Sequence, residues 1–150
     1  MRKFLFLFFA ASSLVLVSCH ENLEERAQRE AREYTAKNCP TPWSGCTRTD
    51  SVVFDIATLT YTYYCSVNDK MDNAELIKAH SLDITNGLKA DVNQNTSLKA
   101  YKEAGFNFAY VLRSSKNPGQ VLYSLKLTKK DYARSVLPKV GGNVGADGAE

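Results

Sequence analysis

The sequence predicts an α+β domain in which an antiparallel sheet of about four strands carries helices on one face. Two pairs of short segments rich in β-branched and aromatic residues, at 51–67 and 106–127, are each interrupted by a few turn-forming positions, which is typical of β-hairpins. A segment with helical periodicity lies between them, at 72–104. Helices with a single apolar stripe are buried best against one face of such a sheet. The order of the strands stays open.

The first 18 residues have the profile of a signal peptide. Arg2 and Lys3 precede an almost wholly apolar run at 4–17, which is too short for a permanent membrane-spanning helix. The end of this run resembles the lipobox of bacterial lipoproteins: Leu16, Val17, Ser18 and Cys19. The resemblance implies cleavage before Cys19 and acylation of that cysteine, and two or three acyl chains would hold the protein on a membrane.

The residue that follows Cys19 bears on which membrane would hold the protein. An aspartate there resembles the inner-membrane retention signal of lipoproteins in diderm bacteria, and this chain has His20 instead. The resemblance therefore implies a protein of the bacterial cell envelope, lipid-anchored to the outer membrane on its periplasmic or surface side. The membrane, reached through the lipid, is the first partner that the sequence predicts.

The charge balance argues against a nucleic-acid partner. The formal net charge of the chain is +3, and loss of Arg2 and Lys3 with the signal peptide lowers it to +1. The remaining charges are interspersed, whereas a nucleic-acid-binding protein gathers several basic side chains on one face to neutralise phosphates. We therefore expect no nucleic acid among the partners.

A charged helical stalk is expected with the lipidated cysteine in the segment 19–38. Its apolar residues are spaced by four, four and three positions, as on one stripe of a helix: Leu23, Ala27, Ala31 and Tyr34. The other faces are dense in Glu and Arg, so the helix would act as a stalk or pack one edge onto the domain.

A break rich in proline and glycine follows at 39–45, where proline disfavours helix at its own and the preceding position. We expect a single α+β domain at 39–135. A flexible tail is expected at 136–150, because its small residues cannot bury enough apolar surface to become ordered.

Alternation along the predicted strands assigns side chains to two faces of the sheet. The core face is expected to hold Leu59, Tyr61, Tyr63, Cys65, Val67, Phe106, Phe108, Tyr110, Leu112, Val121, Tyr123, Leu125 and Leu127. The solvated face is expected to hold Thr60, Thr62, Tyr64, Val111, Arg113, Ser124 and Lys126.

Two helices are predicted between the hairpins. Asp72 fits the start of the first, whose apolar face includes His80 and reaches Val92. The second helix, at 96–104, stops at Gly105, which suits a left-handed cap.

A Cys-Pro break within 38–40 and a Tyr-Lys-Glu-Ala-Gly stretch at 101–105 punctuate this order of elements. The arrangement resembles small lipoproteins of unassigned function in Bacteroidota, in which a charged helix, such a break and two hairpins flank a helical segment with a similar end. The resemblance spans most of residues 21–132 and implies fold and location, not chemistry.

The search for catalytic and metal-binding residues finds no motif. His80 and Asp83 are three residues apart, but a general base with a positioning carboxylate would also need a nucleophile and a cleft. Cys65 lies in no protease-like motif, and no C-x-x-C or H-x-x-x-H pair suits zinc. We therefore expect no enzyme, no metal site and no cofactor, with His80 structural or on the surface.

One disulfide is expected in the domain. Of four cysteines, Cys19 would carry lipid, so at most one pair forms among the other three in an oxidising compartment. A turn near 55–58 would bring Cys46 toward Cys65, and the alternative, Cys39 with Cys46, closes a short loop. The first pairing is slightly preferred, and both stay open.

The function predicted from these patterns is that of a non-catalytic envelope lipoprotein that binds a protein or glycan partner through its solvated sheet face. Trp43 in the proline loop and Tyr64 on the strand are the aromatic residues expected to be exposed. The expected contact residues are Trp43, Tyr64, Thr60, Thr62 and Arg113. The alternative is a lipid-anchored inhibitor of a protease or lysozyme, loosely like cystatin folds, in which hairpin loops plug an enzyme cleft.

Overall fold

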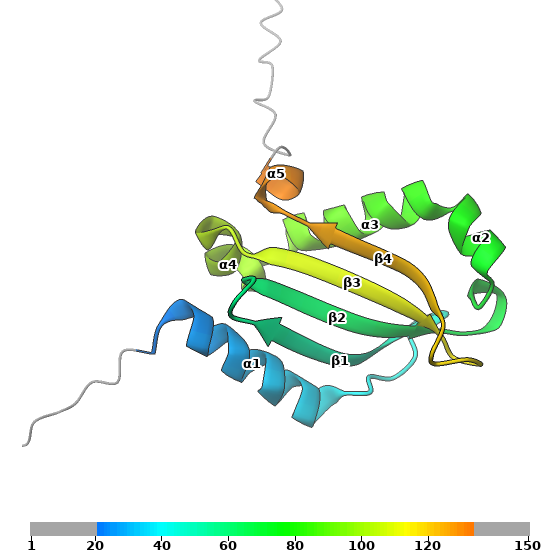
Figure 1. Cartoon of the computed structure of the whole chain (residues 1–150), viewed down its shortest axis with the longest axis horizontal. Helices are drawn as coiled ribbons and strands as arrows, with labels where there is room; N and C mark the ends of the chain where they lie inside the picture. Colours follow the sequence, from blue (N-terminus) through cyan, green and yellow to red (C-terminus); the bar gives the residue numbers. More distant parts are fainter. Residues whose placement is uncertain (1–20, 134–150) are drawn as a thin grey trace, which may run out of the picture.

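The computed structural model of the chain describes residues 21–133, which form a sheet with helices against it (Figure 1). The predicted signal peptide at 1–18, the lipidation site Cys19 and the tail at 136–150 lie outside these residues and stay predictions. None of the helices within 21–133 combines the length and apolar character that crossing a membrane requires.

The sheet contains four strands in the order β1-β2-β3-β4. They are β1 (Thr47–Asp55), β2 (Thr60–Val67), β3 (Asn107–Ser114) and β4 (Val121–Leu127). The α+β class and the two hairpins, β1 with β2 and β3 with β4, are confirmed. The central pair of β2 and β3 is parallel, so the sheet is mixed and not wholly antiparallel as predicted. The helical connection between these strands makes this possible, because a parallel pair requires a crossover.

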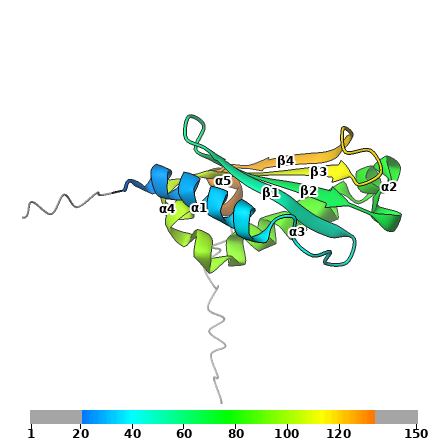
Figure 2. The same cartoon turned by 90° about the horizontal axis from the view of Figure 1, so that it is seen from below.

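The helices lie on one side of this sheet, as an edge-on view shows (Figure 2). They are α1 (Leu23–Asn38), α2 (Ala74–Ala79), α3 (Ser81–Gln94), α4 (Lys99–Ala104) and α5 (Lys129–Tyr132), with short 3-10 turns η1 (Asp69–Met71) and η2 (Thr96–Leu98). The long helix predicted from residue 72 is split at His80 into α2 and α3. Gly105, with φ of 82°, ends α4 in the left-handed conformation that was predicted.

The first helix closes one edge of the sheet. Asn22 and Glu25 form a capping box at its start, and Ala27 and Ala31 on its inner stripe are buried. The Thr35 hydroxyl donates to the carbonyl oxygen of Val52 and accepts from its N–H, both at 2.8 Å. The backbone of edge strand β1 is thereby paired with a side chain, and α1 is part of the folded unit.

The core lies between the sheet and the helices and is mainly aromatic. Phe106 and Phe108 are almost fully buried, and Phe54 stacks on Phe106 with ring centroids 5.0 Å apart. The Tyr61 hydroxyl donates to the carbonyl of Ala27 in α1 at 3.0 Å, which ties the helix to β2. The predicted core positions of β3 are confirmed, because Phe108, Tyr110 and Leu112 are all buried.

One predicted core residue of β4 is on the wrong face. The strand register shifts near Arg113, which pairs with Val121, whereas its neighbour Leu112 pairs with Tyr123. Such a bulge reverses the alternation on which the prediction depended. Val121 is consequently 51% exposed.

Candidate binding face of the sheet

The side of the sheet opposite the helices is left uncovered within residues 21–133 (Figure 2). We call it the open face and define it by the strand register as Arg48, Ser51, Val53, Thr62, Tyr64, Ser66, Ala109, Val111, Arg113, Val121, Ser124 and Lys126. Most residues predicted to be solvated lie on this face, which confirms the assignment by alternation. Their role in binding stays a prediction.

Thr60 was predicted to be a contact residue on this face, but its side chain is buried. It is only 6% exposed, and its hydroxyl donates to the carbonyl of Thr58 at 3.0 Å. The nearby turn also receives the side-chain amide of Asn107, which donates to the same carbonyl at 3.0 Å. Thr60 therefore supports the β1–β2 turn and is not accessible to a ligand.

A polar cluster occupies one end of the open face, where Ser66 of β2 pairs with Arg48 of β1 and Arg113 of β3. Arg48 Nε lies 2.8 Å from a carboxylate oxygen of Asp50, and the Ser66 hydroxyl donates to the other oxygen. The register shift between Thr49 and Ser51 leaves Asp50 without a partner across the ladder. A bulge of this kind re-aims a side chain, and here it brings the carboxylate to Arg48.

Each of the two aromatic residues predicted to be exposed lies against the guanidinium of an arginine. The Arg48 guanidinium carbon lies 4.8 Å from the ring centroid of Trp43, and that of Arg113 lies 5.1 Å from the ring centroid of Tyr64. These are cation–π distances. Trp43, Tyr64 and Arg113 were predicted as contact residues from the sequence, and their role in binding stays a prediction. Arg48 was not predicted, because nothing in the sequence marks the bulge that places Asp50 beside it.

Arg113 differs from Arg48 in its hydrogen bonds. Its Nε is buried and has no hydrogen-bond partner among the described residues, whereas Nε of Arg48 donates to Asp50. A buried donor without an acceptor is unusual in folded proteins and costs about 1–3 kcal/mol. Arg113 is therefore positioned by its stacking on Tyr64, and its guanidinium retains N–H donors that have no acceptor among the described residues.

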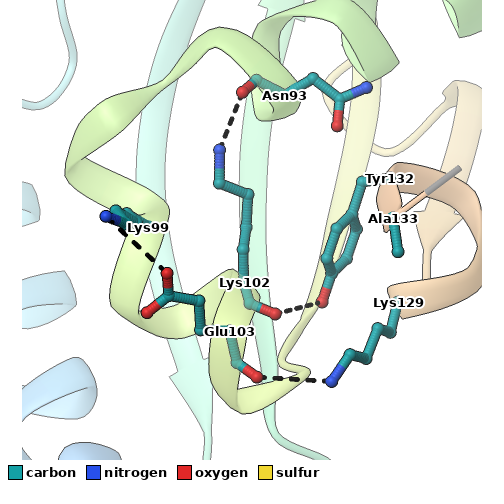
Figure 3. A pocket seen from close by; sticks show the side chains of 7 residues that line it. All are labelled: Asn93, Lys99, Lys102, Glu103, Lys129, Tyr132 and Ala133. Carbon is teal, nitrogen blue, oxygen red and sulfur yellow. Dashed lines mark hydrogen bonds and ion pairs between the residues drawn. The ribbon is translucent and has the colours of Figure 1, made fainter. Parts of the chain in front are cut away.

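A second candidate, a pocket of about 280 Å³ between α3, α4 and α5, is lined by three lysines (Figure 3). The ammonium of Lys102 donates to the carbonyls of Val92, Asn93 and Asn95 at 2.8–2.9 Å. Lys129 reaches the carbonyl of Glu103 at 3.4 Å. The ammonium groups of Lys102 and Lys129 thus satisfy carbonyl groups at helix ends. This pocket therefore stabilises the packing of the helices and does not offer these two charges to a ligand.

A third candidate is a groove of about 370 Å³ between α1 and the η2–α4 segment, and four of its ten lining residues are tyrosines. The Tyr101 hydroxyl donates to Glu30 at 2.6 Å. Burial raises the pKa of Tyr101, and the charge of Glu30 raises it further. Burial opposes ionisation of Glu30, yet hydrogen bonds from Tyr101 and Arg26 leave its pKa below the ordinary value. The groove is aromatic with one carboxylate, which Arg26 already neutralises.

The residues weighed for catalysis are not brought together. His80 lies at the α2–α3 junction with a side chain 55% exposed, and its Nδ1 is 3.5 Å from Asp83. It is not on the buried stripe, because the helix breaks there. Burial raises the pKa of the Cys65 thiol, the opposite of what a nucleophile needs. Within residues 21–133, no group of three or more potential metal ligands gathers.

The predicted disulfides are absent, since Cys39, Cys46 and Cys65 are free thiols. The preferred pairing of Cys46 with Cys65 fails on strand register. Cys65 pairs with Thr49, whereas the carbonyl of Cys46 accepts from the N–H of Asn68 at 3.0 Å. A shift of three residues along a strand is about 10 Å, beyond the reach of a bridge. The alternative pairing of Cys39 with Cys46 is not formed either.

Solved structures with a similar fold include a protein described as secreted and two pilotins of type II secretion systems. A Pseudomonas aeruginosa protein, classed provisionally as secreted, has a TM-score of 0.62 at 14% identity over 73% of this chain and 91% of that chain. The pilotin EpsS of the Vibrio vulnificus type 2 secretion system has a TM-score of 0.55 at 12% identity over 73% and 90%. The type II secretion pilotin AspS of Vibrio cholerae has a TM-score of 0.50 at 17% identity over 73% and 92%. At these identities the likeness establishes the fold.

The sequence itself matches one family profile. The family is described as a domain of unknown function (DUF8479), and the match covers residues 22–123. This range runs from the capping residue of α1 to the third residue of β4 and includes the polar cluster of the open face. No curated protein matches the sequence.

Proposed function

We propose that this chain, which belongs to the DUF8479 family, is a non-catalytic, lipid-anchored protein of the bacterial outer membrane that binds a protein partner through its open face. One observation carries the proposal: an uncovered sheet face bears two arginines held on aromatic rings. Arginine, tyrosine and tryptophan are enriched among the residues that dominate the energy of protein interfaces. Positions fixed in advance also reduce the entropy lost on binding.

A protein partner is favoured over a glycan. The fold is similar to that of two pilotins, which belong to secretion systems built from proteins. The polar cluster at one end of the open face also carries ionic groups, Arg48, Asp50 and Arg113, and such groups give specificity in protein recognition. A glycan-only partner is an outcome that the test below would reveal.

The lipid anchor is tested at Cys19. Cys19→Ala should leave the protein uncleaved or shift it from the membrane fraction to the soluble fraction, because acyl chains would be its only strong hold on the bilayer. Fractionation and mass spectrometry of the mature amino terminus measure both effects. An unmodified Cys19 in the wild-type protein, or cleavage elsewhere, would contradict this part of the proposal.

The binding face is tested by photo-crosslinking in the native envelope. A photoreactive residue at Val53, which is 49% exposed on the open face, should give an adduct of defined mass that protease removes. The matched control is Leu82, which is 76% exposed on α3, and it should give no such adduct. Adducts from Leu82 alone, or binding only to purified envelope glycans, would overturn the proposal.

A further inference from the structure

We infer that Arg113, stacked on Tyr64, is the subsite for a carboxylate of an acidic side chain on the protein partner. The inference rests on the proposed function and names the chemistry that the open face recognises. It depends on three observations: the fixed position of Arg113, its lack of an acceptor, and the pairing of the other arginine of the face.

Arg113 is fixed from several sides. It is the second-last residue of β3, an inner strand between β2 and β4, and its guanidinium lies on the ring of Tyr64. The Ser66 hydroxyl beside it donates to Asp50 and does not accept from the Arg113 Nε. The guanidinium is thus held in one place before any ligand arrives.

Arg113 also lacks an acceptor. Its Nε is buried and unpaired within residues 21–133, and its Nη groups, which a partner would meet, form no hydrogen bond or ion pair with a described residue. A partner that covered the face without supplying an acceptor would desolvate the rest of the guanidinium at a further cost. A carboxylate removes this cost, since its two oxygens match the fork of guanidinium donors.

The other arginine of the open face is compensated. Arg48 is paired with Asp50 at 2.8 Å. Lys126 stands at the opposite end, where its charge helps to stabilise the ionised Asp55 carboxylate of the β1–β2 turn. Neither Arg113 nor Lys126 forms an ion pair with a described carboxylate, but Arg113 is the one of the two held on an aromatic ring, and charge complementarity selects an anionic group for it.

The surroundings favour an acidic side chain over a more highly charged anion. Val111 and Ala109 lie on the same face of β3, toward its start, and offer apolar contact to the methylene groups of Asp or Glu and to a neighbouring apolar residue. The Asp50 carboxylate nearby would repel a dianion such as phosphate more strongly than a single carboxylate. The expected recognition element is thus one acidic residue beside an apolar one.

The first test uses the wild-type protein, purified in detergent with its lipid. The probe is N-acetyl-glutamate amide, and its neutral control is N-acetyl-glutamine amide. We expect the NMR signals of the Arg113 guanidinium Nη–H groups to shift in a saturable manner with the glutamate probe and not with the glutamine control. Equal shifts with both, no shift, or a stronger response to inorganic phosphate would overturn the inference.

The second test follows the Val53 crosslink to the partner. Arg113→Gln should lower the adduct yield at limiting protein about 10-fold or more, as expected for loss of a central charged contact. Lys126→Gln removes a cation at the exposed end and should change the yield less than about 3-fold. Arg113→Lys keeps the charge but not the fork and should also lose several-fold.

The outcomes separate the two proposals. A Val53 adduct that survives Arg113→Gln at wild-type yield would refute the carboxylate subsite and leave the protein-binding face standing. Absence of the adduct in the wild-type protein would refute the proposed function itself. If Arg113→Gln does not fold, as judged by its melting curve, Arg113→Lys and the probe titration of the wild-type protein decide.

Discussion

Two tyrosines three residues apart in β2 show how differently the two faces of the sheet use the same side chain. Tyr61 faces the helices, is 5% exposed and donates to the carbonyl of Ala27. Tyr64 faces away from the helices, is half-buried, and holds the guanidinium of Arg113. On the covered face, burial of the aromatic ring stabilises the fold. On the open face, part of the ring stays accessible to a partner. Substitutions on the two faces should therefore differ in what they damage.

The largest expected difference is between a core aromatic and a strand residue of the open face. Phe108→Ala should lower the free energy of unfolding by about 3–5 kcal/mol, because it leaves a cavity in the core. Val53→Thr, which keeps a β-branched side chain on the other face, should change it by less than about 0.5 kcal/mol. Urea unfolding measures both. Similar losses at both positions would mean that the open face is covered.

A smaller effect is expected where α1 closes the edge of β1. Thr35→Val keeps the shape of the side chain but leaves the N–H and carbonyl of Val52 without their partner, which should cost about 1–3 kcal/mol. Thr62→Val makes the same chemical change on the open face and should be nearly neutral. Equal effects of the two substitutions would refute the role given to the Thr35 hydroxyl.

The tyrosine pair itself gives a finer comparison. Tyr61→Phe removes the hydrogen bond to α1 and should lower the free energy of unfolding by about 1 kcal/mol. Tyr64→Phe keeps the aromatic ring under Arg113 and should leave both stability and the yield of the Val53 crosslink nearly unchanged. A larger loss of stability from Tyr64→Phe would reverse the assignment of the two faces.

The smallest effect concerns acid stability at the β1–β2 turn. Hydrogen bonds from the Thr58 hydroxyl and the Ala57 N–H hold the pKa of Asp55 below its ordinary value. Its stabilising contribution is therefore full above about pH 4 and is lost as pH falls through the lowered pKa. Asp55→Asn should lower the melting temperature at pH 7 more than at pH 3. An unchanged difference between the two pH values would show that ionisation is not what matters.

The sequence was informative wherever neighbouring residues decide the structure. Alternation placed Tyr61, Phe108 and Arg113 on the correct faces, because the side-chain period of a strand is local. It could not predict that β2 and β3 are parallel, since that pairing joins segments separated by the whole helical connection. The bulge at Asp50 was missed for a related reason: only the register with β2 reveals it. The same register is what keeps Cys46 away from Cys65.

The direction of α1 bears on how far the polar cluster would lie from anionic lipid headgroups. Its 16 residues span about 24 Å, and its first turn lies at the opposite end of the sheet from the close of β3, where Arg113 stands (Figure 1). Lipid on Cys19 would hold that first turn near the bilayer. The field of anionic headgroups decays over about 8 Å in physiological salt, so with α1 along the bilayer normal its length would correspond to roughly three screening lengths. The electrostatic interaction of Arg113 with a charged partner would then be much stronger than its interaction with the anionic headgroups of the membrane.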